Sequence, residues 1–367
     1  SSTGITLDVL DVKAVSSATS EATSTGSAEG GVSVGVLSIN STTSGATRAY
    51  VADGGIVNAG QLNVKAAATN NAKTPTAVVG VGLLAGAGGL GDQSYNDMLF
   101  AGLGKAQKIY HFRLIFEETE DASGSQETGM AKLLERGADV IFANGSGLPA
   151  IVDQYAVRYP DKYFIVSDDA SSSHPNVSAM MFQAHEGAFL AGVLAGHMTL
   201  SGKVGFIGGV NIPAIHSFRV GFQEGVAHTD PAVEVVVAFV TTGKDFSGFS
   251  DPGKGAEMAE EMYANGVDII FAAAGLTGNG IIRAAQQAGK YAIGVDADQD
   301  HMAKGKVLTS MMKRLDRAAF LEVTRIVQGA FKAGVTYYSL SNGGVSLSPM
   351  RYTRHLIPDA VLESLKA

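Results

Sequence analysis

The chain has 367 residues, a formal net charge of −8 and a sequence pI near 5.5, and it contains no cysteine. The negative charge, with no block of Lys and Arg to offset it, argues against nucleic acid or an acidic lipid surface as the partner. The lack of cysteine excludes disulfides, thiolate metal sites and cysteine nucleophiles.

Residues 1–75 are rich in Ser, Thr, Ala and Gly and contain short alternating strands. The motif "LDVKA" at 10–14 returns as "LNVKA" at 62–66, so a unit of roughly 50 residues recurs. This pattern resembles the β-helical repeats of haemagglutinin-type adhesins, and an adhesin or surface-interaction function is therefore the alternative for the intact chain. A low-complexity exported tail is the less favoured alternative. Fewer than two repeats are present and stacked repeats usually need about three, so the segment is expected to be poorly ordered alone.

From residue 76 onward, apolar runs alternate with amphipathic helical segments. The apolar run at 77–89 is shorter than the roughly 20 residues of a membrane helix, so we expect no membrane span. Strand-helix alternation with apolar strands predicts doubly wound parallel sheets, and the number of strands predicts two such lobes. Ligands bind such sheets beyond the carboxyl ends of the strands. Those ends carry these polar or small residues: Asp92, Asn96, Asn144, Asp168, Gly275, Asp296.

Several long motifs resemble one family, the basic membrane lipoproteins. They are "GLGDQSYNDMLFAGL" (89–103), "KVGFIGGVNIPAIHSFRVGFQEG" (203–225), "FSDPGKG" (249–255) and "IGVDADQDHMAKGKVLTSMMKR" (293–314). The resemblance runs from about residue 88 to the end. It implies a type I periplasmic-binding fold and a substrate-binding protein of an ABC importer, similar to purine nucleoside receptors. The expected partners are a nucleoside and the importer permease, at a periplasmic or cell-surface location through a lipid anchor that this chain lacks.

The same resemblance sets the expected domain limits. A β-rich repeat segment would fill 1–75, the first lobe 76–182 with 308–340, and the second lobe 183–307 with 341–367. The chain would cross between the lobes near 180–184, 305–309 and 339–344. A junction near Gly88 would make the strand at 77–86 foreign to the family.

The resemblance also assigns roles in the site. Phe100 and Phe249 would stack on the base, while Asp296 and Lys313 would bind the ribose diol. For Phe100 a place in the core, and for Lys313 a solvated strand end, are the alternatives.

Three further positions complete the expected site. Gly275 would let the backbone approach the ligand. Asp92, with Asn96 beside it, and Asp168 would meet the base edge or the ribose, or would instead cap the helices that follow.

No enzyme, cofactor or metal is expected. The alternating aspartates of "DADQD" at 296–300 do not form a calcium loop, because His301 and Val307 stand where Gly and Glu are needed. Asp300 is expected to face water. The segment "GLTGNG" at 275–280 lacks the residues of a phosphate loop, and neither an HExxH pair nor a G-x-S-x-G elbow is present.

Overall fold

The computed structural model describes residues 10–17, 37–42, 46–51, 62–69, 80–119, 123–145 and 147–365. The chain divides into two compact units, residues 1–75 and 76–367.

The described residues of the first unit form two pairs of strands. Its elements are β1 (Leu10–Ser17), β2 (Leu37–Thr42), β3 (Ala46–Val51) and β4 (Leu62–Thr69). β2 and β3 are antiparallel, whereas β1 and β4 are parallel, with Leu10 opposite Leu62 and Lys13 opposite Lys65. The two copies of the repeated motif therefore pair in register. Their resemblance to adhesin repeats stays a prediction.

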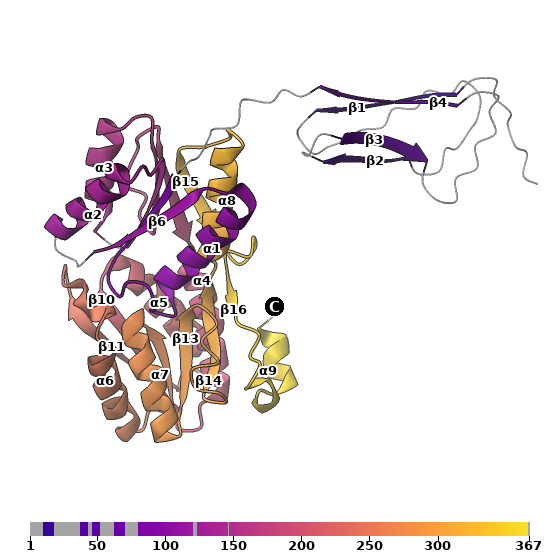
Figure 1. Cartoon of the computed structure of the whole chain (residues 1–367). Coiled ribbons are helices and arrows are strands. Elements are labelled where there is room, and N and C mark those ends of the chain that lie inside the picture. The colour runs from indigo at the N-terminus through magenta and orange to yellow at the C-terminus, as the bar shows by residue number, and fades with distance from the viewer. Residues whose placement is uncertain are drawn as a thin grey trace, which may run out of the picture. The chain divides into compact units, whose positions relative to one another are not determined.

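One lobe of the second unit is built on a six-stranded parallel sheet in the order β15-β9-β8-β7-β5-β6. The strands are β5 (Gly80–Ala85), β6 (Arg113–Glu118), β7 (Val140–Asn144), β8 (Tyr163–Ser167), β9 (Val177–Phe182) and β15 (Gly334–Tyr338). The helices are α1 (Tyr95–Tyr110), α2 (Ser123–Glu135), α3 (Pro149–Arg158) and α8 (Leu315–Val327). Side chains alternate along each strand, so Leu83 packs with α1 and α8 while Leu84 packs with α2 and α3. Both faces of the sheet are thus covered (Figure 1).

The other lobe repeats this plan with the strand order β11-β10-β12-β13-β14-β16, in which β16 alone is antiparallel to its neighbour. The strands are β10 (Lys203–Asn211), β11 (Glu234–Thr242), β12 (Ile269–Ala273), β13 (Tyr291–Asp296), β14 (Val307–Lys313) and β16 (Val345–Leu347). The helices are α4 (Ala184–Met198), α5 (Pro213–Thr229), α6 (Pro252–Ala264), α7 (Leu276–Ala288) and α9 (Asp359–Ser364), with short turns η1 (Phe246–Phe249) and η2 (Arg354–Leu356). Helices α4 and α5 cover one face, and α6 and α7 cover the other. The predicted two-lobed α/β architecture is confirmed.

The chain passes between the two lobes at three places. The first passage follows Phe182 and the third joins Tyr338 to Val345. The second comes after Lys313, because β14 pairs with β13 and places Met311 opposite Val295. The expectation of a crossing near 305–309, and of residues 308–313 in the first lobe, is therefore wrong. The strand is buried as fully as its neighbours, and its residue types alone do not reveal which sheet it joins.

Within the described ranges, none of the helices combines the length and the apolar surface that crossing a lipid bilayer requires.

Helices α4 and α5 approach each other closely because glycines line their contact. A Cβ atom on Gly225 would lie 2.0 Å from the Phe189 carbonyl oxygen, and one on Gly221 would lie 2.2 Å from that of His185. Both neighbours are backbone atoms, so neither can yield without moving a helix.

We expect Gly225→Ala to lower the free energy of unfolding by about 1–3 kcal/mol, since overpacking outweighs the gain in helix propensity. Gly104→Ala is the matched control, because that helical glycine has open space around it. It should stabilise the fold by about 0.5–1 kcal/mol. Urea unfolding measures both changes, and equal effects from the two substitutions would contradict the close packing.

Candidate functional site

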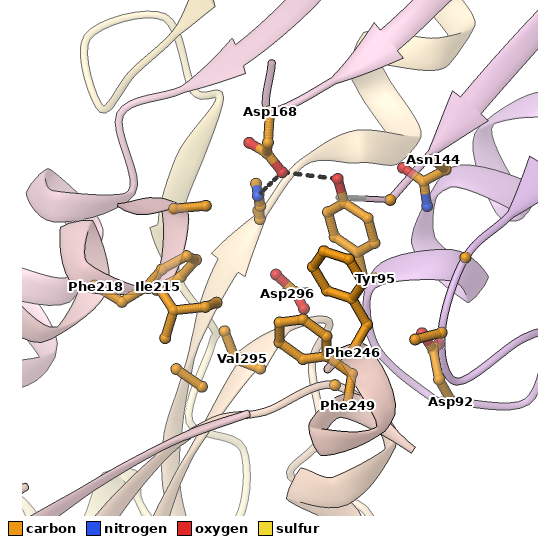
Figure 2. A pocket seen from close by; sticks show the side chains of 17 residues that line it. Asp92, Tyr95, Asn144, Asp168, Ile215, Phe218, Phe246, Phe249, Val295 and Asp296 are labelled. Atoms are coloured by element: carbon orange, nitrogen blue, oxygen red, sulfur yellow. Dashed lines mark hydrogen bonds and ion pairs between the residues drawn. The ribbon is translucent and has the colours of Figure 1, made fainter. Parts of the chain in front are cut away.

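A pocket lies where the carboxyl ends of the strands of both lobes meet (Figure 2). It holds about 690 Å³ of unfilled space, counted with its opening to solvent. Six of the eight expected site residues line it: Asp92, Asp168, Phe249, Gly275, Asp296, Lys313.

Asp168 and Lys313 join the two lobes within this pocket. Asp168 directly follows β8 and has a left-handed backbone with φ of 60°, while Lys313 ends β14. The Lys313 ammonium binds the Asp168 Oδ2 atom, to which the Tyr95 hydroxyl also donates at 2.7 Å. Burial, followed by the charge of Asp168, raises the pKa of Tyr95, so its hydroxyl stays protonated as a donor. Lys313 is 3% exposed, and the Asp168 carboxylate offsets the cost of burying its charge.

Asp296 occupies the end of β13 and is 5% exposed, with φ of 62°. Its Oδ2 atom accepts a hydrogen bond of 2.6 Å from the Ser94 hydroxyl of the other lobe. Burial raises the pKa of Asp296, while Lys313 and the Ser94 hydrogen bond lower it. Left-handed backbone at two non-glycine residues is uncommon, and such strain gathers at functional sites.

Asp92 serves chiefly as a helix cap. Its carboxylate accepts the backbone N–H groups of Ser94 at 2.9 Å, Asn96 at 2.8 Å and Asp97 at 3.1 Å, at the start of α1. These bonds satisfy orphan donors of the first helical turn. Helix capping, the alternative role that the sequence offered for Asp92, is therefore the role that its contacts show. Its side chain also borders the pocket.

Two expected residues lie outside the pocket lining. Asn96 is 1% exposed and donates from Nδ2 to the Asp92 Oδ2 atom at 3.1 Å. Phe100 packs edge-to-face against Phe116, with ring centroids 6.1 Å apart. Phe100 follows Tyr95 by five residues, so it points about 140° away around α1. The structure thus corrects the stacking role expected for Phe100, and its core position was the alternative.

Besides the expected Phe249, the rings of Phe246 and Tyr95, which the sequence did not single out, line the pocket. Phe246 and Phe249 are the first and last residues of the 3₁₀ turn η1. Side chains three residues apart on such a turn lie on the same side. A Cβ atom on Gly209 would lie 2.4 Å from the Phe249 ring, so the absence of a side chain there makes room for it. Tyr95, in the first turn of α1, adds a third ring. The two phenylalanines in "FSGF" were the available signal for Phe246.

Asp298 and Asp300, the two aspartates that follow Asp296, do not line the pocket. Asp298 forms an ion pair of 3.5 Å with Arg351, and Asp300 is 1% exposed rather than facing water as expected. The loop folds back onto the sheet, since the backbone N–H of Gln299 donates to the Ser310 hydroxyl. In the part of the chain that the structure describes, no group of three or more His, Asp or Glu side chains could hold a metal ion.

Asp92 makes the stability of the fold depend on pH. Burial raises its pKa to about 6, against 3.8 in solution, so the folded state binds more protons between these values. The contribution of Asp92 to the free energy of unfolding is therefore greatest below pH 3.8, and it is lost as the pH rises through about 6. Relative to Asp92→Asn, which cannot titrate, the wild type should gain about 2 kcal/mol in free energy of unfolding between pH 7 and pH 4. Urea unfolding across this range measures the difference, and a constant difference would refute the assignment.

Comparisons with known proteins agree with this geometry. The family described as "ABC transporter substrate-binding protein PnrA-like" matches residues 80–362. Basic membrane protein A of Borreliella burgdorferi is 32% identical over 62% of this chain and 66% of that protein. The CD4+ T-cell-stimulating antigen of Listeria monocytogenes is 32% identical over 73% of this chain and 79% of that protein.

Solved structures show the same fold. An ABC transporter solute-binding protein from Aeropyrum pernix is 27% identical, with a TM-score of 0.69 over 78% of this chain and 85% of its own. A LacI family transcriptional regulator from Enterococcus faecium with bound ribose, 17% identical over 75% of this chain and 98% of its own, has a TM-score of 0.57 and shares the fold alone.

The family match begins at residue 80 and includes all of β5. The expected junction near Gly88, with a first strand foreign to the family, is therefore wrong. β5 lies between β6 and β7 in the sheet and is buried along its whole length. From residue 80 to residue 362 the chain belongs to the PnrA-like family of ABC transporter substrate-binding proteins, which bind a solute and do not catalyse a reaction.

Proposed function

We propose that this solute-binding protein captures a nucleoside, with its base against Phe246 and Phe249 and its ribose at Asp296 and Lys313. One observation carries the proposal: flat aromatic rings and a buried carboxylate border the same pocket. These two features suit the two halves of one nucleoside.

The aromatic rings suit the base. Stacking of a base on an aromatic side chain contributes about 1–3 kcal/mol and tolerates different bases. Phe246 and Phe249 come from one turn, and Figure 2 shows both rings in the middle of the pocket with Tyr95 beside them.

The buried carboxylate suits the sugar. Only the Oδ2 atom of Asp296 has a hydrogen bond to a described residue, so Oδ1 can accept from a ribose hydroxyl. Lys313, held by Asp168, lies near enough to stabilise the charge of Asp296. A vicinal diol offers the paired donors that such a carboxylate accepts.

Closure of the lobes completes the site. Ser94 and Asp168 of one lobe contact Asp296 and Lys313 of the other, so binding at these residues depends on the lobes being together. The loaded receptor would then deliver its nucleoside to the permease of an ABC importer, on the outer side of the membrane and held there by a lipid anchor. Hinged closure around a solute is the usual motion of two-lobed receptors.

A thermal melting panel tests the proposal. A ligand at one hundred times its Kd stabilises the folded state by about 2.7 kcal/mol, which corresponds to several degrees. We expect inosine, guanosine or adenosine to raise the melting temperature, and ribose or a free base at equal concentration to raise it less. If no nucleoside changes the melt at millimolar concentration, the proposed function is wrong.

A further inference from the structure

Asn144 lines the pocket and carries a buried hydrogen-bond acceptor without a partner among the described residues. It ends β7, is fully buried and lines the pocket beside Gly145. Its Nδ2 atom donates to the Asn96 Oδ1 atom at 3.0 Å. Its Oδ1 atom has no hydrogen-bond partner among the residues that the structure describes.

The orientation of the Asn144 amide is fixed by its neighbours. The Nδ2 atom of Asn96 faces two oxygens, Asp92 Oδ2 at 3.1 Å and the Ala87 carbonyl at 3.3 Å. A backbone carbonyl only accepts, so reversing the Asn96 amide would place two oxygens against each other. The Oδ1 atom of Asn96 must therefore face Asn144. Because that oxygen only accepts, Asn144 must donate to it from its Nδ2 atom. The Oδ1 atom of Asn144, a residue that lines the pocket, is left without a partner among the described residues.

This acceptor lies near the aromatic part of the pocket. The loop after β7 contacts the Phe246 ring, since a Cβ atom on Gly147 would lie 3.2 Å from it. Figure 2 shows Asn144 and Asp92 on one side of Phe246 and Phe249, with Ile215 and Phe218 on the other. A base against these rings would bring one edge toward Asn144.

We propose that Asn144 is a specificity-determining residue, whose Oδ1 atom accepts a hydrogen bond from an N–H group on the edge of the bound base. The inference rests on the proposed nucleoside-binding function. A buried acceptor is costly when it stays unpaired, so the site discriminates against bases that bring no donor. Asn96 acts as a positioning residue, because it holds the amide of Asn144 in this orientation.

Calorimetry on the full chain tests the inference with a matched pair of ligands. Inosine carries an N–H on its base, whereas purine riboside has the same ring and sugar without one. The wild type should bind inosine at least about tenfold more tightly than purine riboside. Asn144→Leu should bring this ratio close to one, chiefly by weakening inosine. Asn96→Ala, which frees the Asn144 amide to rotate, should lower the ratio part of the way, and a purely structural role would not change a ratio of two ligands.

Two further variants make the result decisive. Asn144→Ser has a hydroxyl that can both donate and accept, and it introduces no charge, so it should retain a preference for inosine even if Asn144→Leu fails to fold. Asn211→Leu alters an exposed residue at the end of β10, outside the pocket lining, and should leave the ratio unchanged. Equal affinity for the two ligands in the wild type, or a ratio that persists in Asn144→Leu, overturns the role of Asn144 and leaves the proposed function standing. Absence of binding by any nucleoside overturns both.

Discussion

Replacing Asp296 with asparagine should weaken ribonucleoside binding about tenfold or more and remove most of the preference for ribonucleosides over 2'-deoxynucleosides. Asp296 is 5% exposed and already binds the Ser94 hydroxyl through one oxygen, which leaves the other for the sugar. An amide supplies a single acceptor and no charge. In the wild type, loss of the 2'-hydroxyl should itself cost about tenfold, because a buried carboxylate oxygen is left unpaired. Calorimetric titration with inosine and 2'-deoxyinosine measures both effects.

Asp298→Asn is the matched control for this substitution. Asp298 lies two residues further along the same loop and pairs with Arg351, and it does not line the pocket. Its replacement should leave the affinities for both ligands nearly unchanged. EDTA should also have no effect. Equal binding of inosine and 2'-deoxyinosine by the wild type, or binding that EDTA abolishes, would show that Asp296 does not bind a ribose diol.

Truncating Phe249 to alanine should weaken the binding of every nucleoside by about tenfold to a hundredfold, the loss of one stacking ring. Its ring lines the pocket, and Gly209 and Gly275 contact this part of η1 closely. Stacking does not depend on which hydrogen-bond donors a base carries. The affinities for purine and pyrimidine nucleosides should therefore fall by similar factors. The ratio of ribonucleoside to deoxynucleoside affinity should stay as in the wild type.

Phe100→Ala gives the control with the same change in side chain. Phe100 lies outside the pocket lining and packs on Phe116, so its loss should reduce stability more than binding. Fluorescence-monitored titrations of the two variants compare them directly. A loss of affinity in Phe100→Ala as large as that in Phe249→Ala would contradict the placement of the two rings.

The residues at the strand ends were predictable from the sequence because the physics of a parallel sheet gathers them at one edge. Asp168 and Asp296 each follow an apolar run, and the structure places both in the pocket. Helix periodicity, in contrast, says which residues share a face but not which face meets the ligand. That choice depends on how α1 packs on its sheet, and it separates Tyr95 from Phe100.

Other features depended on contacts between distant segments. Whether β14 joins one sheet or the other is settled by its pairing with β13, which no local pattern in "VLTSMMK" specifies. The burial of Asp300 follows from a loop that folds back on its own sheet. The free acceptor on Asn144 depends on hydrogen bonds through Asn96 to Asp92, and Asn144 is 48 residues away from Asn96 in the sequence.

Calorimetric titration of the full chain with inosine, hypoxanthine and ribose tests the central claim most directly. Because the aromatic rings and Asp296 act on the two halves of one molecule, inosine should bind at one site per chain and far more tightly than either of its fragments. Binding of ribose as tight as that of inosine, or no measurable binding of inosine or any other nucleoside, would contradict the account of this pocket as a nucleoside site.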